Sequence, residues 1–315
     1  MSPICEPEMT DPSTHSDNAY DSLAEAHDDA RWAYGTGFDD PLAGVDTTLP
    51  DGTDGAALAA YCLMLADDAL IMSQRLAEWS TYAPELEEEV ALANVGLDLL
   101  GQARLLLARA AAADPSCVPA LSGGSPVPAE DALAYFRDEQ SFRNVRLAEV
   151  DNGDFAASIA RLFCFSAWRL SILQRLRDSH DPVVAAVAAK GVKELAYHRD
   201  YAARWLVTLA QGTDESRRRM VAGLSYCWPY VGELFAAHPV ESALPGIAVD
   251  SPAVRPEFDE TIAAVLDAAN LDLPDAPFAR AVDGRAGRDG VHTEAMGHLL
   301  AEMQAVARAH PMGSW

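Results

Sequence analysis

Two segments of this chain have the residue spacing of a helical di-iron centre, but each lacks the glutamate that would bind the metal. Helical di-iron proteins place a Glu-x-x-His step on each of two helices, because residues three apart lie on the same helix face. In this chain the two steps are Leu99-x-x-Gln102 and Leu195-x-x-His198. A leucine side chain has no atom that binds iron, and a glutamine amide is a poor, neutral substitute for imidazole. The sequence therefore predicts a degenerate site, with no metal and no catalytic residue in this chain.

The remaining carboxylates in the apolar segments supply only part of the ligands that a di-iron centre needs. A di-iron centre needs about four carboxylates and two histidines that converge from four helices. Besides His198, the sequence offers Asp68, Asp98 and Glu194, and Asp98 is one residue out of register with the ligand position. Ser166 stands in the third segment, where a carboxylate would be needed. We therefore expect no two-iron centre, and a single adventitious metal ion is the alternative.

These polar residues need other partners if they are buried without a metal, because an unpaired buried charge costs several kcal/mol. We predict that they form a hydrogen-bonded network across the former site, in which the carboxylates keep His198 protonated. The predicted members of this network are Asp68, Asp98, Gln102, Glu194 and His198.

Helical periodicity dominates the chain after residue 55. Apolar residues such as Leu58, Leu65, Met72 and Leu76 recur every three or four positions, which predicts a helix of about six turns. Since no segment alternates apolar and polar residues as a strand does, we predict an all-α fold of long antiparallel helices. Helices are expected over residues 56–79, from 84 to beyond 109, and over 131–147, 155–175, 182–211, 216–237, 256–269 and 293–309.

Residues 1–54 differ in composition from the rest. They are rich in acidic and small polar residues, and Arg31 is their only basic residue. Such a segment is too polar to bury a core, so we predict a mostly disordered acidic extension before a helical domain at residues 55–315. Three aromatic residues interrupt it in the patch 31–38. This patch either packs on the chain's own bundle or docks a partner subunit.

Composition narrows the functional classes. Half of the 315 residues are apolar, enough for a substantial core. The net charge of −25 disfavours nucleic acid and anionic membrane surfaces as partners, because both are negatively charged. The five cysteines are scattered without a C-x-x-C pair, and the first residues lack the basic and apolar regions of a secretory signal. Neither a phosphate-binding loop nor a dinucleotide-binding glycine motif is present. We expect a protein of the reducing cytoplasm.

Three smaller features invite competing interpretations. His292 and Glu294 could suggest a metal site, but they are two residues apart, and Thr293 as a helix N-cap is the better interpretation. The glycine-rich loop 281–290 is expected to be a flexible hinge into the last helix. The basic cluster 217–219 is expected to be a solvated helix start or salt-bridge partner, and contact with coenzyme A phosphates is the alternative.

Four blocks of the sequence resemble the family that forms the structural C component of ring-1,2-phenylacetyl-CoA epoxidases. They cover residues 65–79, 91–104, 193–198 and 290–304, and the resemblance spans residues 55–315. It implies a ferritin-like, non-catalytic structural subunit that pairs with a homologous di-iron catalytic subunit. The complex would be a hetero-oligomeric monooxygenase that uses O2 and NADPH to epoxidise phenylacetyl-CoA in aerobic phenylacetate catabolism. The block 290–304 would form either a contact between subunits or part of the substrate environment.

Two alternatives lie in other functional classes. One is a free-standing ferritin-like oxygenase or ferroxidase that binds metal through Asp68, Asp98, Glu194 and His198. The other is a homodimeric helical scaffold without an enzyme partner. Iron binding separates the first from the structural subunit, and the identity of the partner separates the second.

Overall fold

A computed structural model describes residues 42, 44–121 and 123–313 of the chain. These residues belong to the larger of two compact units, which spans Pro41–Trp315. The predicted aromatic patch at 31–38 and most of the acidic extension lie outside the described residues.

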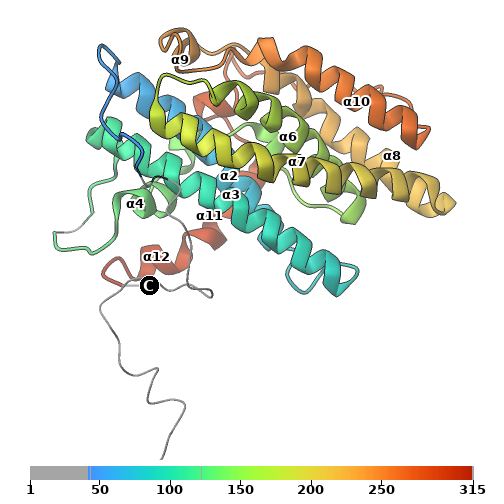
Figure 1. Cartoon of the computed structure of the whole chain (residues 1–315). Coiled ribbons are helices and arrows are strands. Elements are labelled where there is room, and N and C mark those ends of the chain that lie inside the picture. Colours follow the sequence, from blue (N-terminus) through green and yellow to red (C-terminus); the bar gives the residue numbers. More distant parts are fainter. Residues whose placement is uncertain (1–41, 43, 122, 314–315) are drawn as a thin grey trace, which may run out of the picture. The chain divides into compact units, whose positions relative to one another are not determined.

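Four long helices carry the positions singled out in the sequence. They are α2 (Gly55–Ala77), α3 (Leu86–Ala113), α6 (Phe155–Leu176) and α7 (Pro182–Gln211). Helix α2 packs against α3 and α6 packs against α7, while α3 also lies beside α7 (Figure 1). Within the described part of the chain, the only β-type pairing is an isolated bridge between Val282 and Arg285. The prediction of an all-α fold is confirmed.

Local sequence signals fix several helix ends. The Asp54 carboxylate accepts the backbone N–H groups of Ala56 and Ala57 and so begins α2. Asp154 caps α6 in the same way, and Pro182 occupies the first turn of α7 behind the cap Asp181. The predicted start of the second helix at Pro84 is wrong by two residues, because α3 begins at Leu86.

The C-terminal third of the chain forms shorter elements around these helices. They are α8 (Asp214–Cys227), η3 (Trp228–Phe235), α9 (Pro239–Ser242), η4 (Ser251–Val254), α10 (Arg255–Ala269), η5 (Gly287–Asp289), α11 (Glu294–Met303) and α12 (Ala305–Ala309). The helices predicted at 216–237 and 293–309 are each broken into two, and the one at 256–269 agrees with α10.

The single helix predicted over residues 131–147 is wrong. The chain instead forms α4 (Ala129–Tyr135), η2 (Glu139–Ser141) and α5 (Arg146–Glu149), with irregular backbone between them. The reason is tertiary, because backbone N–H groups that a helix would use internally are donated to α2. The N–H of Arg143 donates to Asp67 at 2.8 Å, and that of Val145 donates to Asp68 at 2.8 Å.

Three described helices, α2, α3 and α6, are long and apolar enough to cross a membrane by length and composition alone. In α2 and α6 the most apolar windows are 78% and 100% buried inside the bundle, so core packing accounts for their composition. In α3 only 44% of the window is buried. This helix is thus as apolar as a core helix, but it is covered on one side only.

Candidate functional site

The residues of the degenerate site face one another from the four long helices. The side chains of Leu99 and Leu195 are completely buried and belong to the hydrophobic core. They occupy the two positions where glutamates would be needed for iron. Ser166 of α6 is also completely buried, and its hydroxyl makes no hydrogen bond within the described part of the chain. None of these three side chains supplies a ligand of the kind that iron prefers.

Asp68 of α2 is paired with an arginine that comes from the C-terminal region. Both guanidinium Nη atoms of Arg288 donate to the Asp68 carboxylate at 2.9 Å, and the backbone N–H of Val145 donates to it at 2.8 Å. Burial raises the pKa of Asp68 above its usual value, although the nearby charges of Arg288 and Arg169 act in the opposite direction. A two-pronged arginine contact of this kind is strong and directional. The carboxylate is therefore already engaged and has a positive partner.

Arg169 of α6 lies at the centre of the former site, and it was not identified from the sequence. Its side chain is completely buried. The guanidinium donates through Nε (3.1 Å) and Nη2 (3.0 Å) to the Gln102 side-chain oxygen, and through Nη1 (3.1 Å) to the carbonyl of Leu65. A second Arg169 contact, at 4.0 Å, reaches the Asp68 carboxylate. Burial lowers the pKa of Arg169 to about 10, so the side chain stays charged at neutral pH.

Gln102 extends this network from α3 to α7. Its amide nitrogen donates to the Glu194 carboxylate at 2.9 Å, and Lys190 lies 3.4 Å from the same carboxylate. Gln102 and Glu194 are therefore bonded directly, as predicted, whereas Asp68 is connected to Gln102 only through Arg169. An arginine within an otherwise apolar run, as in the α6 segment 162–170, is the signal that could have revealed it.

Asp98 and His198 form a separate contact at the seam between α3 and α7. The Nε2 atom of His198 lies 3.0 Å from the Asp98 carboxylate, whose side chain is 40% exposed. The other ring nitrogen, Nδ1, is buried without a hydrogen-bond partner in the described part of the chain. No hydrogen bond among the described residues joins this pair to Gln102 or Glu194. The prediction of one network through all five residues is therefore wrong, and the protonation of His198 stays a prediction.

The geometry does not suit a two-iron centre. Among residues 42, 44–121 and 123–313, no three histidine, cysteine, aspartate or glutamate side chains converge as metal ligands would. The positions for two glutamates are leucines, and the Arg169 guanidinium would repel a divalent cation at short range. That this chain binds no metal stays a prediction.

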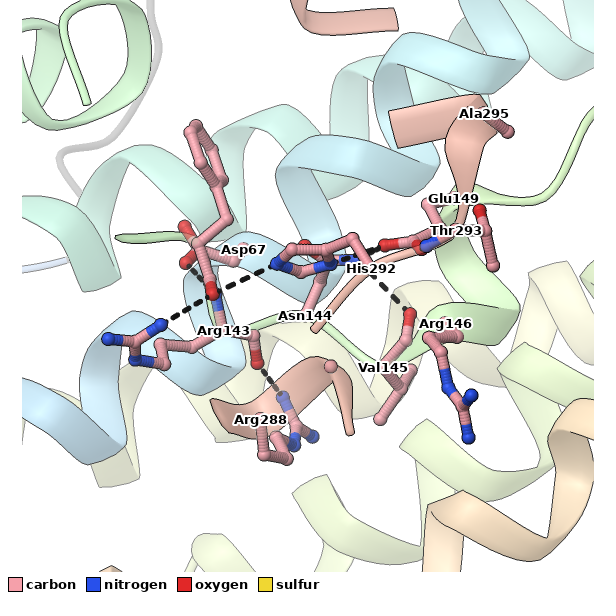
Figure 2. A network of polar contacts seen from close by, with 12 residues as sticks. Asp67, Arg143, Asn144, Val145, Arg146, Glu149, Arg288, His292, Thr293 and Ala295 are labelled. Carbon is pink, nitrogen blue, oxygen red and sulfur yellow. Dashed lines mark hydrogen bonds and ion pairs between the residues drawn. The ribbon is translucent and has the colours of Figure 1, made fainter. Parts of the chain in front are cut away.

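A second buried network joins the C-terminal region to α5, and it was also missed from the sequence. Figure 2 shows His292 directed toward the completely buried Glu149. The carboxylate of Glu149 accepts from His292 Nδ1 at 2.7 Å, from Asn144 at 2.8 Å and from the backbone N–H of Thr293 at 2.5 Å. The Nε2 atom of His292 lies 3.2 Å from the carbonyl of Phe142.

Both ring nitrogens of His292 face acceptors, which favours the doubly protonated imidazolium. Burial by itself lowers the pKa of His292, but the hydrogen bond and negative charge of Glu149 outweigh it and raise the pKa above its usual value. Thr293 stands at the N-cap of α11 as predicted, but its hydroxyl makes no capping bond. The predicted N-cap position is confirmed, and the backbone N–H of Thr293 itself donates to Glu149.

The loop at 281–290 is anchored, so its prediction as a flexible hinge is wrong. Besides Asp68, Arg288 donates to the carbonyls of Met64 (2.9 Å) and Arg143 (2.8 Å), and the latter contact appears in Figure 2. Gly290 has a φ of +75°, and a Cβ there would lie 2.2 Å from the carbonyl oxygen of Gln140. The glycine permits close packing against the bundle.

The basic cluster 217–219 is engaged within the chain. Arg218 and Arg219 both contact Glu215, and Arg217 donates to the carbonyls of Ala210 and Asn270. These contacts agree with the predicted salt-bridged helix start.

Comparison with known proteins identifies the family of this chain. Residues 45–315 match the model of a family described as phenylacetic acid catabolic protein. The chain belongs to this family. A relative from Escherichia coli (strain K12), the C component of the 1,2-phenylacetyl-CoA epoxidase, is 42% identical over 260 residues, which cover 82% of this chain and 99% of the relative. The resemblance found in the sequence is thus confirmed. The fold of this family is a ferritin-like helical bundle, which α2, α3, α6 and α7 form in this chain.

Proposed function

We propose that this chain is a non-catalytic structural subunit of a multicomponent phenylacetyl-CoA ring epoxidase in the cytoplasm. It pairs with and stabilises a homologous catalytic subunit that holds the di-iron centre, in a complex that uses O2 and NADPH for aerobic phenylacetate catabolism. The similarity to the C component of an epoxidase supports the choice of complex. The observation that carries the non-catalytic role is the buried guanidinium of Arg169 between Asp68 and Gln102.

The balance of charges at the former site supports a role without a metal. The acidic groups near the former site are Asp68, Asp98 and Glu194, and the nearby cations are Arg169, Arg288 and Lys190. Iron sites attract a divalent cation through an excess of carboxylates. Here the positive groups are at least as many as the negative ones, so a metal ion would have to displace arginines that are already hydrogen-bonded. The cross-helix contacts stabilise the bundle without a metal.

The proposed role is tested by reconstitution with the homologous catalytic subunit. We expect that this chain raises the melting temperature of the catalytic subunit and elutes with it in size-exclusion chromatography. We also expect the pair, with its reductase, to epoxidise phenylacetyl-CoA. Because this chain acts through contact, the variant Arg169→Lys, which keeps the positive charge, should support the same activity once folded. A catalytic subunit that is equally stable and active without this chain would contradict the proposal.

A further inference from the structure

The outer face of α3 is unusual for a helix on the surface of a very acidic protein. Its exposed large apolar residues are Leu86, Val90, Leu97 and Leu100, which are 71%, 52%, 64% and 40% exposed. Their spacings of four, seven and three place them along one side of the helix. This side is opposite to the inner stripe that enters the core. Since α3 is apolar on both sides but buried on one, its composition indicates a second covered face.

Gly101 lies on the same outer face, and contacts within the chain do not explain it. A glycine in the interior of a helix destabilises the helix relative to alanine, because it loses more backbone freedom on folding. A Cβ at Gly101 would meet nothing within 4 Å. The surrounding structure would thus tolerate alanine. A glycine at an open helix position permits a neighbouring backbone to approach closely.

Helix α7 continues this face on one side of α3. Tyr197 is 56% exposed and stacks on Tyr201 with 6.4 Å between ring centroids. The hydroxyl of Tyr201 and the indole nitrogen of Trp205 both donate to Glu88 of α3. Together with the Asp98–His198 pair, these contacts hold the two helices in a fixed relation. The surface is preorganised, which lowers the entropic cost of binding.

The two helices run antiparallel, and the two ends of the face differ in charge. Gln102 lies beside Gly191, whereas Glu88 contacts Tyr201 and Trp205 further along α7. The Gln102 end carries Arg104, Lys190 and Lys193, which include the only two lysines of the chain. Arg104 lies 3.8 Å from Glu130 and Lys190 lies 3.4 Å from Glu194, so Lys193 is the cation of this end without an ion pair among the described residues. The Glu88 end carries Glu85, Glu87 and Glu89, with the neighbouring Arg204 on α7.

We propose that this α3/α7 face, defined by Leu86, Val90, Leu97, Leu100, Gly101 and Tyr197, docks the homologous helical subunit of the complex. The proposal rests on the proposed function. A partner with the same fold has an equivalent pair of helices and can meet this face with its own in an antiparallel arrangement. A partner whose equivalent helices carry the same two ends would place its acidic end against Arg104, Lys190 and Lys193. Charges of this kind set orientation, and the apolar stripe supplies most of the binding energy.

The size of the face suits a specific interface. Residues 86–104 of a helix extend about 28 Å, and two adjacent helices are about 20 Å wide. The flat area is therefore about 560 Å² per partner, or about 1,100 Å² in total, which exceeds the roughly 1,000 Å² expected of a biological interface.

The test is the substitution Leu97→Arg in the full chain, co-expressed with the homologous catalytic subunit. The control is Leu273→Arg, which changes a similarly exposed leucine (59%) in the segment after α10. Binding is measured by sedimentation velocity, and folding is checked by circular dichroism. We expect Leu97→Arg to weaken the complex at least tenfold and Leu273→Arg to leave it unchanged.

A cysteine-labelling experiment provides an independent readout. In Leu97→Cys the new thiol is exposed, and we expect its maleimide labelling to slow at least tenfold when the partner is bound, whereas Leu273→Cys labels at the same rate. Equal binding by Leu97→Arg and unprotected labelling of Leu97→Cys would overturn the docking face while leaving the proposed function intact. A wild-type chain that does not bind the partner at all would overturn both. A wild-type homodimer that Leu97→Arg dissociates would show that a second copy is the occupant, against the proposal.

Discussion

The centre of the bundle and the C-terminal contact with α5 each hold a buried carboxylate, and each balances its charge with a different kind of side chain. In the centre, the carboxylate of Asp68 is balanced by the guanidinium groups of Arg288 and Arg169. In the C-terminal contact, the carboxylate of Glu149 is balanced by the imidazole of His292. Guanidinium is charged at every physiological pH, whereas imidazole loses its charge near neutrality. The cations of the centre should therefore keep their charge as the pH rises through neutrality, whereas the cation of the C-terminal contact should lose it.

Removal of the Arg169 guanidinium from the centre should have the largest effect on stability. We expect Arg169→Leu to lower the free energy of unfolding by about 3–5 kcal/mol, because it leaves Gln102 and Asp68 buried with fewer partners. The measurement is urea denaturation followed by circular dichroism. Arg175→Leu, a partly exposed arginine in the same helix, is the matched control and should cost less than about 1 kcal/mol. A loss for Arg169→Leu as small as that of its control would contradict the central role of this guanidinium.

Removing the second arginine should have a smaller effect. Arg288→Leu deletes the two-pronged contact with Asp68 but leaves Arg169 beside the carboxylate. We expect a loss of about 2–3 kcal/mol in urea denaturation. Arg285→Leu, an exposed arginine three residues earlier, should be nearly neutral. A destabilisation larger than that of Arg169→Leu would mean that the anchored loop, not the central guanidinium, dominates.

The C-terminal contact should give a pH-dependent stability. Because the folded-state pKa of His292 is raised above 6.5, its stabilisation is complete below that pH and is lost as pH rises through the folded-state value. The difference in unfolding free energy between wild type and His292→Gln should therefore be largest below pH 6.5 and shrink as the pH rises through the folded-state pKa of His292. His298→Gln, an exposed histidine of α11, should show no such trend. A difference that grows with pH would refute the imidazolium at Glu149.

The Asp98–His198 contact between α3 and α7 should contribute least to the free energy of unfolding. Asp98 is partly exposed, so solvent screens its contact with His198. We expect Asp98→Asn to change the free energy of unfolding by less than about 1 kcal/mol. Thermal denaturation at several salt concentrations measures it, and a loss comparable to that of Arg288→Leu would place His198 within the central network after all.

The sequence predicted features that depend on local pattern. Apolar periodicity predicts the long helices without reference to distant residues, and α2, α6 and α7 lie within two residues of the expected ranges. The leucines at 99 and 195 likewise indicated a degenerate site by their chemistry alone.

The features that were missed depend on contacts across the fold. Arg169 and Arg288 reach carboxylates and carbonyls that are far away in sequence, so spacing does not reveal their partners. The segment 131–147 has helical composition, but its backbone N–H groups at Arg143 and Val145 bind α2. Tertiary hydrogen bonds there override local propensity.

The most direct test of the central claim is the iron content of this chain, purified alone and loaded anaerobically with ferrous ion. We predict near-zero bound iron and no colour change on exposure to O2, because Leu99, Leu195 and Arg169 occupy the places of ligands and metal. Binding of about two irons per chain, with an O2-dependent absorption change, would contradict this prediction. That result would favour the free-standing oxygenase or ferroxidase and direct mutagenesis to Asp68, Asp98, Glu194 and His198.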